Sequence, residues 1–226
     1  MARGNPTDYF ALDGASLNIN SSDEGVSINV AEAMNERGDF VARDTFEEIA
    51  NPSCTYSLCD DYTVASLSLG AKISDYIVTG ITINTSAGTG PTIEVSGEEV
   101  PEGFAQGYTY TTPTFTLKKN HEAQILFAAF TLTGTDCYVE SCSASLNCTL
   151  SRALDSNAET CAGDVNGGVI EVTATIVQAG ATAPSITPDA DWTVTSPLTI
   201  SESNDAYSTH TVTLRKSLAA VAPVED

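Results

Sequence analysis

Apolar and polar residues alternate along several stretches of the chain, as in β-strands that bury one face. The clearest stretch is 168–178, which sets Ile170, Val172, Ala174 and Ile176 on one side. This segment is predicted to be a strand of a half-buried sheet. Further strands are predicted at 54–59, 77–83, 92–97, 108–117, 142–150, 192–200 and 209–214, the one at 108–117 being broken near Pro113. The Gly- and Pro-containing segment 86–91 predicts a turn, and therefore a hairpin between two of these strands.

Two segments follow a helical pattern instead. Asp44 stands three residues before Glu47, as in a capping box, and Pro52 follows, so a short helix is predicted at 44–48. A second helix is predicted after mid-chain, with Asn120 as its cap and Gly134 as its stop. Its apolar packing face, which would cover a sheet, consists of Ala123, Leu126, Phe127 and Phe130.

Short strands at this spacing with one covering helix indicate a mainly β protein. We expect a β-sandwich or open barrel with one flanking α-helix. Because no linker or internal repeat is visible, residues 1–226 are predicted to form a single structural domain. Residues 7–31 suit an opening strand pair or a flexible N-terminal arm, and the tail after Leu218 is expected to be mobile.

The charge of the chain is strongly negative. Nine Lys and Arg residues face 30 Asp and Glu residues, which gives a formal net charge of -21. Such a surface repels phosphate backbones, so ordinary nucleic-acid binding is not expected. No Lys or Arg occurs between Arg152 and Arg215. The candidate acids for a lumen or surface in this stretch are Asp155, Glu159, Asp164, Glu171, Asp189, Asp191, Glu202 and Asp205.

The sequence offers little catalytic chemistry. Its two histidines, His121 and His210, have no metal-binding spacing, and no G-x-S-x-G, H-E-x-x-H or Walker A pattern occurs. We therefore predict that the protein is not an enzyme and holds no cofactor or metal. No run of 18 apolar residues and no signal-peptide pattern is present, so neither a membrane span nor export is expected.

The cysteines and acidic pairs leave some alternatives open. Cys137, Cys142 and Cys148 are spaced by four and five residues, which suits strand positions better than a zinc knuckle. Buried free thiols are favoured, with disulfides and zinc as alternatives. Asp60 with Asp61, Asp189 with Asp191, and Asp155 with Glu159 could bind Ca²⁺ or act in a glycosidase, but solvated loops are favoured.

The order of elements resembles that of a known class of proteins. The elements are a short N-terminal strand region, the segment 44–48 leading into 52–56, a helix after mid-chain, and the start of a late strand at 163–168. Their order resembles that of the virion proteins of tailed bacteriophages. The chain looks most like their major tail tube proteins. The cysteine content and the lack of a long loop that could link rings depart from that family.

The resemblance implies a structural role. In tail tube proteins a β-sandwich flanked by a helix forms hexameric rings, neighbouring sheets join into an inner barrel, and loops and terminal arms link stacked rings. Their lumen is typically negative, so DNA passes without being specifically bound. The expected partners are copies of the chain and other tail or virion proteins, and the expected location is the virion, after synthesis in the host cytoplasm.

Other functions are open from the sequence. One is a capsid decoration or head-fibre protein, which would be equally acidic and β-rich. Another is a carbohydrate-binding or adhesive β-sandwich module, for which eight Tyr residues and Trp192 would supply stacking surfaces.

Overall fold

The computed structural model consists of β-strands and connecting segments. It describes residues 6–34, 36–37, 40–63, 67–86, 89–101, 104, 107–113, 116–117, 129–134, 136–154, 160–179, 184–202 and 207–222. The strands are β1 (Leu17–Met34), β2 (Phe40–Leu58), β3 (Tyr62–Thr63), β4 (Lys72–Ile73), β5 (Tyr76–Ser86), β6 (Thr89–Glu99), β7 (Thr109–Tyr110), β8 (Thr116–Leu117), β9 (Phe130–Thr133), β10 (Cys137–Leu154), β11 (Thr160–Ala179), β12 (Ser185–Pro188), β13 (Thr193–Glu202), β14 (Tyr207–Ser217) and β15 (Ala220–Val221).

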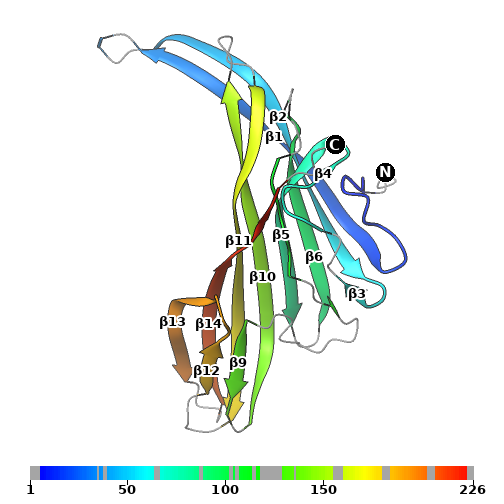
Figure 1. Ribbon diagram of the computed structural model, residues 1–226, viewed down its shortest axis with the longest axis vertical. Helices are drawn as coiled ribbons and strands as arrows, with labels where there is room; N and C mark the ends of the chain where they lie inside the picture. Colours follow the sequence, from blue (N-terminus) through cyan, green and yellow to red (C-terminus); the bar gives the residue numbers. More distant parts are fainter. Residues whose placement is uncertain are drawn as a thin grey trace.

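One large sheet organises the molecule (Figure 1). It has nine strands in the order β1-β2-β6-β5-β10-β11-β14-β13, with β4 attached to β5 off this path. Every pairing in it is antiparallel. The pairs β9–β12, β7–β15 and β3–β8 form small two-stranded sheets beside it. The mainly β fold class predicted from the sequence is therefore confirmed.

Two helices were predicted from the sequence, but no helix occurs among the described residues. The helix predicted at 44–48 is wrong: this segment belongs to β2 and pairs with β1, for example Thr45 with Val30. Apart from a bulge between Thr45 and Glu48, the antiparallel partner β1 accompanies this segment, and an isolated helical turn is costly to form. Of the second predicted helix, Ala123, Leu126 and Phe127 lie outside the described residues, whereas Phe130 begins strand β9.

Apolar side chains of neighbouring strands line up across the sheet. One row runs from edge to edge, with each member directly opposite the next on the adjacent strand. Its members inside the sheet are buried, whereas Ile19 and Val194 at its two ends are only partly buried or exposed. The row consists of Ile19, Tyr56, Ile93, Ile83, Ala144, Val172, Leu214 and Val194.

Connecting segments cover the apolar face of the sheet and complete the core. The ring of Phe10 lies against Gly97 of β6, where an added Cβ would come within 3.0 Å of it. The Tyr110 ring lies against Gly168 of β11 at still shorter range. Leu67, Leu69, Leu117 and Ala129 join the same core. The second layer is thus irregular rather than a second large sheet.

The N-terminal segment from Pro6 to Ser16 lies against the sheet. Tyr56 donates a hydrogen bond to Asp8 over 2.5 Å, and Tyr76 donates one to Glu24 over 2.9 Å. Burial and the bond to Glu24 raise the pKa of Tyr76 to about 12. At the other terminus, Ala220–Val221 pairs with β7 as β15.

Two hairpin arms extend beyond the sheet (Figure 1). β2 pairs with β6 only through Ser53–Ser57, so residues 25–34 and 40–51 form a two-stranded first arm. This arm is about 30 Å long at about 3.3 Å per residue. Residues 149–154 and 160–166 form a shorter second arm in the same way.

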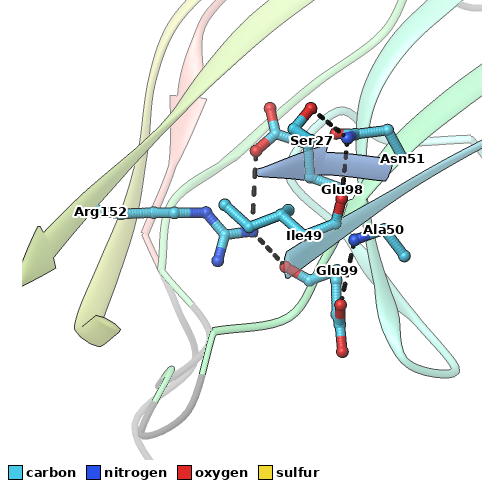
Figure 2. A network of polar contacts seen from close by, with 7 residues as sticks. All are labelled: Ser27, Ile49, Ala50, Asn51, Glu98, Glu99 and Arg152. Atoms are coloured by element: carbon cyan, nitrogen blue, oxygen red, sulfur yellow. Dashed lines mark hydrogen bonds and ion pairs between the residues drawn. The ribbon is translucent and has the colours of Figure 1, made fainter. Parts of the chain in front are cut away.

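A network of polar contacts holds the bases of the two arms together (Figure 2). Nη2 of Arg152, in the second arm, donates to the Glu99 carbonyl oxygen over 2.6 Å and lies 3.7 Å from the Glu98 carboxylate. The Glu99 carboxylate accepts from the Ala50 amide at 3.1 Å, in the first arm. Asn51 then joins β2 to Ser27 of β1 over 2.7 Å. Arg152 therefore ties β10 to the end of β6, and Glu99 continues the tie to the first arm.

We expect Arg152→Met to reduce the free energy of unfolding by about 1–3 kcal/mol, because a charge-assisted bond made by a side chain only 11% exposed is lost. Urea unfolding followed by circular dichroism measures this. The matched control is Glu98→Gln, whose more exposed carboxylate makes only the longer contact and which should change stability by no more than about 0.5 kcal/mol. Equal unfolding midpoints for Arg152→Met and the parent would contradict the proposed tie.

Candidate functional site

The opposite face of the large sheet is lined by small polar side chains. On this face one row crosses every strand of the β1-to-β13 path and carries no charge. Its members are half-buried or exposed, and each lies opposite the next on the neighbouring strand. The row consists of Asn18, Ser57, Thr92, Asn84, Ser143, Thr173, Thr213 and Ser196.

A second polar row runs parallel to the first, on the other side of the apolar row. It carries two acids, Glu94 and Glu171, and one cation, Arg215. The row consists of Ser21, Thr55, Glu94, Thr82, Ser145, Glu171, Arg215 and Thr193. We call the surface formed by these two rows, together with the neighbouring Asp23 of β1, the polar face.

An open groove of about 490 Å³ lies on the polar face where hairpin β5–β6 meets β10 and β11. Its lining includes Asn84, Thr92, Ser143, Thr173 and Thr175, and no lining residue is charged or aromatic. Cys142 also borders the groove, but its side chain is buried on the core side of the sheet, and burial raises the pKa of its thiol to about 12. The groove therefore lacks a side chain suited to proton transfer near neutral pH.

The sheet has two open edges among the described residues. β1 pairs only with β2, and β13 pairs only with β14. β13 is also interrupted, because Pro197 lies in a bulge between Ser196 and Thr199. A proline and a bulge are common protections of edge strands against unspecific pairing.

The acids predicted from the sequence are spread over several parts of the subunit. Glu171 lies on the polar face, Asp164 is exposed on the second arm, and Asp189 and Asp191 are exposed in the connection between β12 and β13. Glu202 ends β13. Asp155, Glu159 and Asp205 lie outside the described residues. The structure does not bring the described members together within one subunit, and a shared lumen surface stays a prediction.

Sequence reasoning missed the acids that do share the polar face with Glu171, namely Asp23 and Glu94. Charge counting singled out the stretch between Arg152 and Arg215 instead. The alternation of apolar and polar residues in the sequence could have located Glu94. It stands between Ile93 and Val95 in a strand, so its side chain must point away from the core. Which alternating polar residues become neighbours depends on strand register, and this required the structure.

No metal centre is formed by the described part of the chain. It contains no group of three His, Cys, Asp or Glu side chains placed to hold an ion. All six cysteines are described and carry free thiols. His210 is buried, with Nε2 2.9 Å from the Ser208 hydroxyl, whereas His121 lies outside the described residues.

The described aromatic residues do not form one exposed platform around Trp192. This side chain is half-buried and packs against the core. The exposed Tyr138 and Tyr207 lie opposite Val177 and Ala179, so they flank one end of β11.

Comparison with known proteins does not assign the chain to a family. No protein-family model matches the chain, and no curated protein sequence matches it significantly. Among the described residues there is also no helix with the length and apolarity needed to cross a bilayer.

The environments of the thiols predict their reactivity. Burial raises the pKa of both Cys142 and Cys148 to about 12, so only about one thiol in ten thousand is ionised at pH 8. We expect the exposed Cys59 and Cys161 to react first with a disulfide reagent, and Cys142 and Cys148 only after unfolding. Peptide mapping after timed labelling checks this. Early labelling of Cys142 in the folded protein would contradict it.

Proposed function

We propose that the chain is a structural virion subunit whose copies join edge to edge into rings that stack into a phage tail tube. The resemblance of the sequence suggests hexameric rings. The observation that carries the proposal is a sheet that is open at both edges, with a polar face that runs between them without interruption.

The strand order favours closure by rotation. The path from β1 to β13 holds eight strands, the nine of the sheet less β4, and they alternate in direction. In a ring of rotated copies, β13 of one subunit would therefore run antiparallel to β1 of the next. The pairing pattern of the subunit would then continue through the ring, and each copy would cover the other's unpaired edge.

The polar face suits the wall of a passage for DNA. Its hydroxyl and amide groups keep it hydrated, and its charges are Asp23, Glu94 and Glu171 against the single Arg215. A wall with a net negative charge and few cations repels phosphate groups, so a duplex can slide past it without adhering.

The arms suit contacts between rings. The sequence offered no long loop for this purpose, whereas the structure shows two projecting hairpins. Val26 and Ile28 of the first arm and Leu154 of the second are exposed apolar side chains. A two-stranded ribbon is only marginally stable alone, so such arms are expected to pack against another molecule.

We expect the purified chain to form rings with a central hole in negative-stain images, and these to become more abundant or longer as salt is raised from about 0.05 to 0.5 M. The reason is that salt screens the repulsion between subunits of net charge -21 within a Debye length of about 10 Å or less. Rings that dissociate steadily with added salt would show that ion pairs hold them and would contradict this account.

The same images separate the alternatives. Isolated monomers or trimers at every salt concentration would favour a capsid decoration or head-fibre protein. Binding to a glycan array, lost on Tyr138→Ala or Tyr207→Ala and seen without self-assembly, would favour a carbohydrate-binding module.

A further inference from the structure

We infer that Arg215 of one copy and Asp23 of the next copy form the charged contact that sets the register between their sheets. This inference rests on the proposed function, because it concerns the edge-to-edge joint of that assembly. Beyond the proposed function, it specifies which side chains face each other across the joint. It thereby specifies how the β13 edge of one subunit aligns with the β1 edge of its neighbour.

Backbone pairing alone specifies this joint poorly. Pro197 has no amide hydrogen, and it lies in the bulge of β13, so the edge offers only short segments for a ladder. The bulge in β1 between Ile19 and Ser21 interrupts the other edge as well. Side chains must therefore supply much of the register of the joint.

The apolar row indicates one particular alignment. It ends at Val194 on the β13 edge, which is 43% exposed, and at Ile19 on the β1 edge, which is partly buried. If the row continues from one subunit to the next, Val194 meets the neighbour's Ile19 and both become covered. The polar row then also continues, from Thr193 to the neighbour's Ser21.

This alignment brings opposite charges together. Arg215 lies opposite Thr193, one strand in from the edge, and Asp23 lies two residues beyond Ser21 on the other edge. With strands about 4.8 Å apart and about 3.4 Å per residue, the two Cα atoms are about 10 Å apart across the strands and about 7 Å along them. An extended arginine and an aspartate can bridge this separation.

Both groups are available for such a contact. Arg215 and Asp23 are exposed, and neither makes an ion pair among the described contacts. Glu171 lies opposite Arg215 on the neighbouring strand β11 of the same subunit. The adjacent Lys216 is instead occupied by Asp191 at 3.6 Å. Of the two described cations on β14, Arg215 therefore remains for a neighbour.

Charge reversal tests the contact. We expect Arg215→Glu and Asp23→Arg each to lower the association constant of the chain about two- to fivefold, measured by sedimentation velocity at low salt. The double variant Arg215→Glu with Asp23→Arg should return to within about twofold of the parent. In about 1 M salt, where the Debye length is about 3 Å, the variants should converge.

Matched controls carry the same changes of charge elsewhere. Lys72→Glu and Asp75→Arg alter exposed residues of β4 and the following turn, and these two variants should show no mutual rescue. Thermal unfolding of every variant checks that the subunit itself is intact.

The outcomes separate this inference from the proposed function. Suppose that the parent chain forms rings but the association constant of the double variant is as low as the two single changes together predict. The Arg215–Asp23 contact is then wrong, and the ring proposal stands. If the parent forms no rings or larger assemblies at any salt concentration, the proposed function fails, and the contact fails with it.

Discussion

The structure depends on the register of antiparallel strands, which keeps the two-residue alternation of side chains in phase from one edge of the sheet to the other. The apolar row from Ile19 to Val194 lies between two polar rows, and each row takes one residue from every strand of the path. A slip of one residue in a central strand would place Ile83 on the polar face and Asn84 in the core. Correct pairing therefore produces the core and the polar face in the same step.

Strands with clear alternation could be predicted from the sequence. In β11, Ile170, Val172, Ala174 and Ile176 are all buried, as expected. The hairpin formed by β5 and β6 is confirmed, although Thr89, Gly90 and Pro91 of the predicted turn already belong to β6. In both cases the signal is local, because each strand needs only its own period and nearby turn residues.

Prediction failed where a distant partner decides the structure. Asp44 and Glu47 have the spacing of a helix cap, but β1 pairs with this segment on both sides of a bulge, so it extends β2. The arms were missed for a related reason: whether a third strand accompanies residues 25–34 and 40–51 depends on strands that follow much later in the sequence. The polar face could not be predicted for the same reason. The Ser141-x-Ser143-x-Ser145 pattern is visible in the sequence, but the residues of β5 and β11 that lie beside these serines are not.

The chain has few cations, and three of them lie at defined positions in the fold. Arg152 ties the second arm to the end of β6, and Lys216 pairs with Asp191 near the open edge. Arg215 stands on the polar face among hydroxyl groups and carboxylates. The net charge of -21 opposes contact between any two copies, and this repulsion acts in every relative orientation. Arg215 weakens this repulsion only where an acid of the neighbour lies beside it, so even a contact of about 1 kcal/mol can select one alignment among several that apolar edges would tolerate. Apolar burial at Val194 and Ile19 would then supply adhesion, while charge would determine which edges meet.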